Sequence, residues 1–83
     1  MAFVYLYEHS NYEGRWMEIP AGGASFQPIN RQEFGVSSIK IPSGFVVELS
    51  NSQGSELYKE STPYVGDAMN DRVEGIAITQ IYT

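Results

Sequence analysis

The chain has 83 residues, no cysteine and a formal net charge of −5, from ten acidic and five basic side chains. This length leaves room for one small core without disulfide support, and the acidic balance excludes a nucleic-acid backbone binder, which needs clustered Lys and Arg. No apolar run approaches the ~20 residues that span a bilayer, and the start, Met1–Tyr7, has no basic region and no cleavage site. We therefore expect no membrane partner, no removed leader and, by default, a cytoplasmic location.

Short apolar stretches rich in β-branched and aromatic residues alternate with Gly and Pro and predict an all-β domain. The expected strands, in chain order, are Phe3–Glu8, Arg15–Ile19, Ser25–Gln27, Val36–Ile41, Phe45–Ser50, Ser55–Lys59, Thr62–Val65 and Val73–Ile81. Alternation along the strands predicts an inward-facing set made of Val4, Leu6, Met17, Ile19, Ile39, Ile41, Val47, Leu49, Ile76 and Ile78. Trp16 falls on the opposite face.

The chain also contains an internal repeat. Val4–Tyr7 is echoed by Val47–Ser50, and each is followed by a Gly and a short strand, at Gly14 and at Gly54. Each half then closes on a β-rich run, and the turn Pro42-Ser43-Gly44 joins the halves. Two similar halves, about 1–42 and about 43–83, predict two packed sheets with Greek-key connections in one domain over 1–83.

The segment from Tyr7 to Gly14 resembles the signature of βγ-crystallin domains. In that family an aromatic residue precedes a Gly by seven positions and a second aromatic stands just before the Gly, and Tyr7, Tyr12 and Gly14 fill these places. The hairpin folds over its sheet, one ring packs beneath it, and Gly supplies a backbone angle that a Cβ would oppose. Both halves and their order match, so the resemblance implies a microbial-type single domain with two Greek-key motifs forming a two-sheet sandwich.

The departures from the family pattern affect its second element, an Asn/Asp pair followed by two variable residues and two hydroxyl residues. In the first half Glu33-Phe34 replaces the pair, although Ser37-Ser38 is kept. In the second half Asn70-Asp71 is kept, but Glu74-Gly75 replaces the hydroxyls. The second hairpin is shortened and has Ser50 where the aromatic belongs, so we expect it to form an ordinary turn.

In the family, calcium is clamped between the hairpin of one motif and the Asn/Asp–Ser loop of the other. The resemblance implies one weak calcium site here, formed by Glu8 on the first hairpin with Asn70, Asp71 and Glu74. The alternative for Asn70 and Asp71 is a turn in which both side chains bond locally.

A second calcium site would need the shortened hairpin around Asn51 together with Glu33 and Ser37. Because the hairpin lacks residues and Glu33-Phe34 has replaced the Asn/Asp pair, we expect this second site to be lost.

No residue set predicts catalysis. His9 is a lone histidine on a hairpin, where a solvated turn residue is expected, and Ser37 and Ser38 have no buried carboxylate and base to activate them. We therefore expect a non-enzymatic structural or stress-associated domain with at most one weak calcium site. The alternative is a calcium-independent protein-binding module (an inhibitor, toxin-like or coat protein), or self-association, through Trp16 and Tyr12 on the first hairpin.

Overall fold

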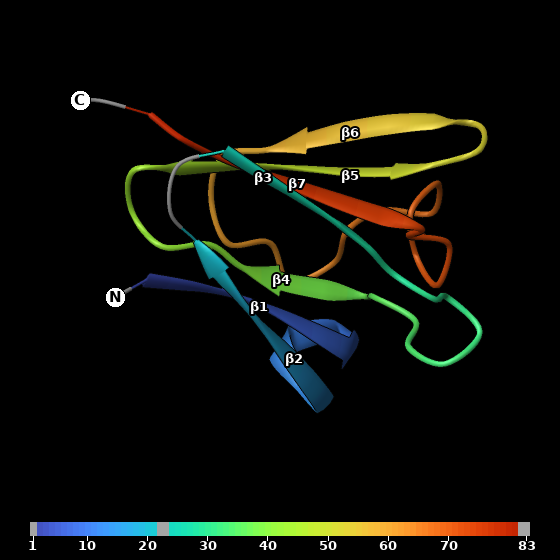
Figure 1. Cartoon of the computed structure of the whole chain (residues 1–83). Helices are drawn as coiled ribbons and strands as arrows, with labels where there is room; N and C mark the ends of the chain where they lie inside the picture. Colours follow the sequence, from blue (N-terminus) through green and yellow to red (C-terminus); the bar gives the residue numbers. More distant parts are fainter. Residues whose placement is uncertain (1, 22–23, 82–83) are drawn as a thin grey trace.

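The computed structural model describes residues 2–21 and 24–81, which form seven β-strands in two stacked sheets (Figure 1). The strands are β1 Ala2–His9, β2 Glu13–Ala21, β3 Ala24–Pro28, β4 Ser38–Lys40, β5 Phe45–Asn51, β6 Gly54–Tyr58 and β7 Gly75–Gln80, and a short 3₁₀ turn, η1 Ser10–Tyr12, joins β1 to β2. The all-β prediction is confirmed. Within the described ranges, no helix is long and apolar enough to cross a membrane.

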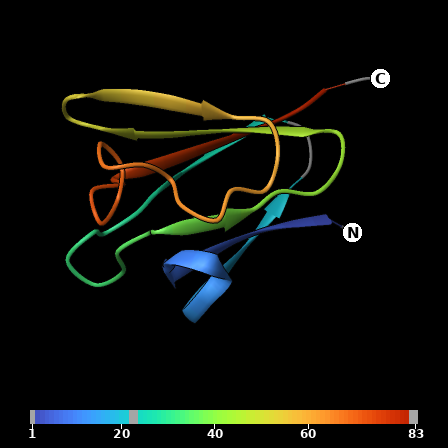
Figure 2. The ribbon, with the colours of Figure 1, turned by 180° about the vertical axis from the view of Figure 1, so that it is seen from behind.

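The two sheets do not divide the chain at the boundary between its halves. The first sheet has the strand order β2-β1-β4 and the second has the order β3-β7-β5-β6. Strand β3 comes from the first half but pairs with β7, so that Gln27 lies opposite Ile76. In return, the chain between β6 and β7 runs past β4 (Figure 2), where Thr62 pairs with Ile39 in a single antiparallel bridge. Each half therefore completes the sheet of the other.

Side chains from both sheets meet in one apolar core. Of the residues predicted to face inward, Val4, Leu6, Ile19, Ile39, Val47, Leu49, Ile76 and Ile78 are buried, whereas Met17 and Ile41 are half-buried at the margin. The outward prediction for Trp16 is confirmed, because this residue is 60% exposed. Alternation missed the loop residues that complete the core, among them Phe34, Val36, Val65, Met69 and Val73, since period 2 applies only to strands.

Two expected strands are shorter than predicted, and a third is reduced to a bridge. Val36–Ile41 becomes β4 and Val73–Ile81 becomes β7, while Thr62–Val65 keeps only its pairing at Thr62. Val36 and Ser37, which precede β4, do not form a β-ladder with the second half. Each accepts a single hydrogen bond from a loop of that half. The Val65 amide donates to the Ser37 carbonyl at 2.9 Å, and the Asp71 amide donates to the Val36 carbonyl at 3.0 Å.

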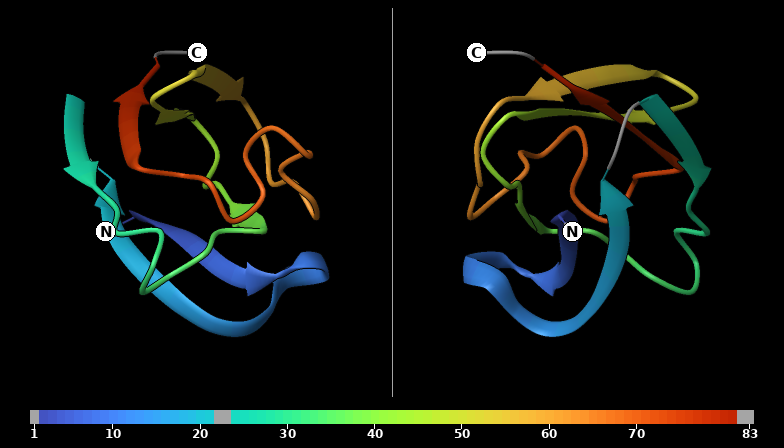
Figure 3. Two further views of the ribbon diagram at one scale, coloured as in Figure 1. Left: turned by 90° about the vertical axis from the view of Figure 1, so that its right-hand side faces the viewer. Right: turned by 60° about the vertical axis from the view of Figure 1, so that its left-hand side comes forward.

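The first hairpin folds back over its sheet, as predicted. Figure 3 shows the chain turning at η1 and returning as the strongly curved β2. The Asn11 amide donates to the Pro63 carbonyl at 2.9 Å, and the Tyr12 amide donates to Ser38 Oγ at 3.0 Å. The rings of Tyr7 and Tyr12 meet edge to face with centroids 5.8 Å apart. Aromatic packing and long-range hydrogen bonds thus hold this hairpin in place.

The second hairpin is a tight turn between β5 and β6, also as predicted. Asn51 and Gly54 are paired across it, and the Gln53 amide donates to Asn51 Oδ1 at 2.8 Å. This side-chain bond is an Asx turn, which mimics a backbone turn and needs no packing from elsewhere.

Candidate functional site

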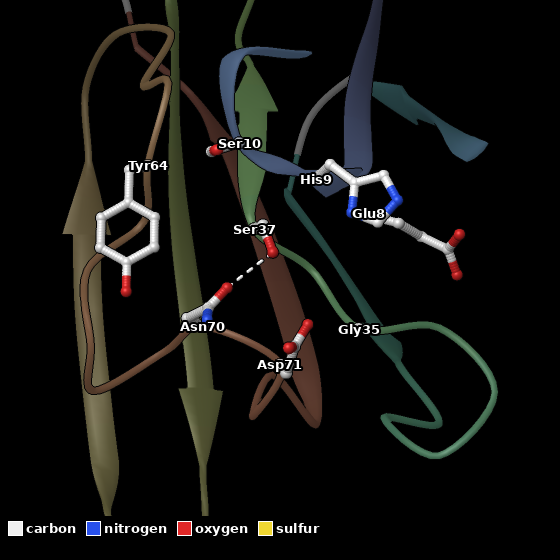
Figure 4. A pocket seen from close by; sticks show the side chains of 8 residues that line it. All are labelled: Glu8, His9, Ser10, Gly35, Ser37, Tyr64, Asn70 and Asp71. Carbon is white, nitrogen blue, oxygen red and sulfur yellow. Dashed lines mark hydrogen bonds between the residues drawn. The ribbon is translucent and has the colours of Figure 1, made fainter. Parts of the chain in front are cut away.

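A polar pocket of about 460 Å³ lies between the first hairpin and the two loops that precede β4 and β7. We call it the first pocket; its lining residues are Glu8, His9, Ser10, Gly35, Ser37, Tyr64, Asn70 and Asp71 (Figure 4). The fold thereby brings residues from the beginning, middle and end of the chain to one place. Because both halves contribute, an ion bound here would join them.

Ser37 and Asn70 are linked directly across the first pocket. The buried Ser37 hydroxyl donates a hydrogen bond to Asn70 Oδ1 at 2.6 Å (Figure 4). Backbone bonds hold both residues: the Ser37 amide donates to the Tyr7 carbonyl and the Asn70 amide to the Gly66 carbonyl, each at 2.8 Å. Two neutral oxygens from different halves are therefore held together.

Asp71 supplies the carboxylate of the first pocket. Its φ is 57°, a left-handed conformation that Asp tolerates better than most residues. The carboxylate lies against Gly35, where an added Cβ would be 2.3 Å from Asp71 Oδ1. Among the described residues, none donates a hydrogen bond to the Gly35 carbonyl. Sequence reasoning missed Gly35, whose only signal was a glycine at a variable position of the family pattern.

Asn70 and Asp71 lie in a backbone turn, as the turn interpretation expected, but the Asn70 side chain does not bond locally: its Oδ1 accepts from Ser37, 33 residues away in the chain. The Met69 and Asn70 amides both donate to the Gly66 carbonyl, at 3.1 and 2.8 Å, and the Arg72 amide donates to the Met69 carbonyl at 2.9 Å. The turn and the pocket are compatible, because the same turn places Asn70 against Ser37 and Asp71 against Gly35.

Glu8 lies at the first pocket, but its carboxylate is turned away. Arg15 Nε donates to Glu8 Oε1 at 2.8 Å, Arg15 Nη2 donates to Oε2, and the same Nη2 donates to the Glu33 carbonyl at 3.0 Å. The hydrogen bond from Arg15 holds the pKa of Glu8 below its usual value. Figure 4 shows the carboxylate extending away from Asn70 and Asp71. The side chain expected to be a ligand is thus engaged elsewhere.

The structure does not bring Glu74 to the first pocket. Glu74 Oε1 accepts a hydrogen bond from the Ser52 amide at 3.0 Å, and Oε2 lies 3.7 Å from Arg31 Nε. Glu74 therefore faces the second hairpin, and Ser37, which the sequence assigned to the second site, lies in the first pocket instead. The predicted grouping has to be corrected because each loop serves both pockets: its early residues reach one hairpin and its later residues the other.

A second pocket of about 350 Å³ lies at the β5–β6 turn and is lined by Arg31, Asn51, Ser52, Gln53 and Arg72. By position in the repeat it corresponds to the second calcium site of the family. Two guanidinium groups repel a cation there, and the loss of this calcium site stays a prediction.

The chemistry of the first pocket is that of oxygen ligands without an acidic cage. In residues 2–21 and 24–81, no group of three or more His, Asp or Glu side chains could hold a metal ion. His9 is exposed, in agreement with a solvated turn residue. The Ser38 hydroxyl is committed to structure, since it donates to the His9 carbonyl at 2.6 Å and accepts from the Tyr12 amide.

No protein-family model matches the sequence, and the curated proteins give no match either. Solved structures do match. A βγ-crystallin domain from Clostridium beijerinckii is 26% identical, with a TM-score of 0.76 over 94% of this chain and 98% of that one. A clostrillin double mutant with two serines replaced by histidine, in complex with nickel, is 26% identical, with a TM-score of 0.78 over 95% and 99%.

A βγ-crystallin domain from Flavobacterium johnsoniae is 19% identical and has a TM-score of 0.78, covering 96% of this chain and 97% of that one. At 19% identity, this match shows a likeness of fold alone. All three matches run over nearly the full length of both chains and agree with the two-sheet topology found here. The chain therefore has the βγ-crystallin fold of these microbial domains.

Proposed function

We propose that this chain is a non-enzymatic structural domain that binds one calcium ion weakly in the first pocket. The observation that supports this most is the convergence of Ser37 Oγ, Asn70 Oδ1 and the Asp71 carboxylate in one pocket that Gly35 also lines. Calcium prefers six to eight oxygen ligands at about 2.3–2.6 Å, from carboxylates, amides and carbonyls, with water completing the shell. The lining residues offer these ligand types.

Weak binding follows from the charges. The Asp71 carboxylate lies in the first pocket beside Gly35, whereas the Glu8 carboxylate is paired with Arg15. With one carboxylate and otherwise neutral oxygens, we expect a dissociation constant of about 10⁻⁴–10⁻³ M, as in extracellular calcium modules. At a hundredfold excess over that value, binding stabilises the folded state by about 2.7 kcal/mol. The role is structural, since the ion joins the first half at Ser37 to the second at Asn70.

The test is calorimetric titration of metal-free protein with calcium. We expect at most one ion per chain, and we expect Asp71→Asn to abolish the calcium-dependent rise in melting temperature. Glu74→Gln and Glu33→Gln are matched controls, because both remove a carboxylate outside the first pocket. Two ions per chain, or loss of binding in the Glu74→Gln variant, would contradict the proposal.

A second candidate is a calcium-independent protein-binding module, favoured by the first hairpin. Trp16 is 60% exposed on β2, which forms an edge of the first sheet. Tyr7, on the neighbouring strand, lies opposite Trp16 in the register. If this surface serves self-association, sedimentation should show a mass that rises with protein concentration, and Trp16→Ser should remove that rise. A concentration-independent monomer would leave no support for self-association here.

A further inference from the structure

Two of the five basic residues of the chain, Arg31 and Arg72, line the second pocket, although the net charge is −5. The β5–β6 turn and the loops before β4 and β7 meet there, at the right-hand end of the molecule in Figure 1. The other lining residues, Asn51, Ser52 and Gln53, are polar. Positive charge is thus concentrated at one place on an acidic domain.

Among the described residues, few groups accept hydrogen bonds from the side chains of these two arginines. A guanidinium presents five N–H groups. Within the described part of the chain, Arg31 has one ion pair, to Glu74, and its 3.7 Å separation is too long for a hydrogen bond. Among the same residues, no hydrogen bond from the Arg72 side chain is found. Arg15 differs, since it donates to both oxygens of Glu8 and to the Glu33 carbonyl.

The two pockets occupy equivalent places in the repeat but carry opposite charge. Arg72 stands two residues after Asn70, as Gly35 stands two residues after Glu33. At Gly35 the absent side chain makes room for the Asp71 carboxylate, whereas Arg72, at the equivalent position of the repeat, carries a guanidinium and lines the second pocket. Beside the second pocket, Glu74 Oε1 accepts a hydrogen bond from the Ser52 amide at 3.0 Å, and this bond holds the carboxylate at the β5–β6 turn.

We propose that the second pocket is a binding site for a small oxyanion, one that carries a phosphate or carboxylate group and is held by Arg31 and Arg72. The planar guanidinium matches both groups with paired hydrogen bonds. The volume of about 350 Å³ is near the lower end of the ~300–1,000 Å³ typical of ligand pockets. The acidic surroundings repel a long polyanion, so the ligand is a small molecule and not a nucleic acid.

Inorganic phosphate titrated into metal-free, isotope-labelled protein at constant ionic strength tests the proposal. We expect saturable shifts of the Ser52, Gln53 and Arg72 amide signals, with a millimolar dissociation constant. Arg31→Gln and Arg72→Gln should each weaken binding at least fivefold. Lys59→Gln, which removes an exposed cation outside the pocket, should leave binding unchanged. Acetate, titrated in the same way, shows whether a carboxylate is also accepted.

Shifts that do not saturate, or an equal loss of binding in the Lys59→Gln and Arg72→Gln variants, would overturn the proposal. The same variants separate it from the calcium site. Arg72→Gln should leave calcium binding unaltered, and Asp71→Asn should leave phosphate binding unaltered, so that each site can fail alone.

Discussion

Left-handed backbone conformations are concentrated at the first hairpin and the first pocket. Outside glycine, positive φ occurs within the described ranges at Asn11 (60°), Tyr12 (61°) and Asp71 (57°). Such conformations cost of order 1–3 kcal/mol each and persist where surrounding contacts compensate them. Here the Asn11 amide bonds to Pro63 and the Tyr12 amide to Ser38. The strain at Asn11 and at Asp71, whose amide bonds to the Val36 carbonyl, therefore lies where the two halves touch, whereas the Tyr12 bond stays within the first half.

Gly14→Ala should destabilise the domain by about 1 kcal/mol or more. The φ of Gly14 is +83°, and an added Cβ would be 2.4 Å from Cδ2 of His9. For a domain of this size, each kcal/mol lowers the melting temperature by about 4–8 °C, which calorimetry resolves. Ser55→Ala is the control, because Ser55 is an exposed residue of the second hairpin. This variant should change the melting temperature little. Equal melting shifts for the two variants would contradict the asymmetry between the hairpins.

Gly35→Ala should weaken calcium binding at least fivefold while changing the stability of the metal-free protein much less. The new methyl group would be 2.3 Å from Asp71 Oδ1, so the carboxylate has to rotate out of the first pocket. Calorimetric titration measures the first quantity and urea unfolding without metal measures the second. If calcium binds to this variant as to the parent, the Asp71 carboxylate is not a ligand.

At the scale of elements, β6 is tied to the chain that follows it by one side chain. The Tyr58 hydroxyl donates to the Val65 carbonyl at 2.6 Å. Burial, with a smaller contribution from Glu56, raises the pKa of Tyr58 to about 12. This contact fixes the segment that carries the Thr62 bridge and Val65, so it supports the exchange between the halves.

Tyr58→Phe should cost about 1–2 kcal/mol, since it leaves the Val65 carbonyl without its donor. Because the folded-state pKa is raised, the stabilisation is complete below pH about 10 and is lost as the pH rises to about 12. Urea unfolding at pH 7 and pH 11 should therefore show a smaller difference for this variant than for the parent. Tyr5→Phe is the control; an identical pH effect in all three proteins would argue against this role.

At the scale of the whole molecule, the reciprocal strand exchange predicts that the halves unfold together. Leu49 of β5 is fully buried, so Leu49→Ala should cost about 2–5 kcal/mol. That is comparable with the total stability of a domain this small. Trp16 lies in the other sheet. In the Leu49→Ala variant we expect the Trp16 fluorescence and the far-ultraviolet circular dichroism to be lost in one transition, at a lower urea concentration than in the parent protein.

Leu57→Ala is the matched control, because Leu57 is 58% exposed and such surface changes stay within about 0.5 kcal/mol. A Trp16 transition that keeps its midpoint in the Leu49→Ala variant would show that the halves unfold independently.

Much of this protein can be read from its sequence, because local chemistry decides it. Alternation identified the inward faces of the strands, and Tyr7, Tyr12 and Gly14 predicted a folded first hairpin. The missing aromatics of the second half predicted its simple turn. These features depend on neighbours within a strand or a turn, where side-chain direction and backbone angle follow from residue type.

Only the tertiary structure decided which loops meet. Glu74 was expected beside Asn70 but faces Ser52, Ser37 was expected in the second site but bonds to Asn70, and the Glu8 carboxylate is held by Arg15. The pairing of β3 with β7 was equally invisible in a linear repeat. Two similar halves can be joined in more than one way, and the choice depends on packing between residues far apart in the chain. The strands and turns were therefore predictable, whereas the membership of each pocket was not.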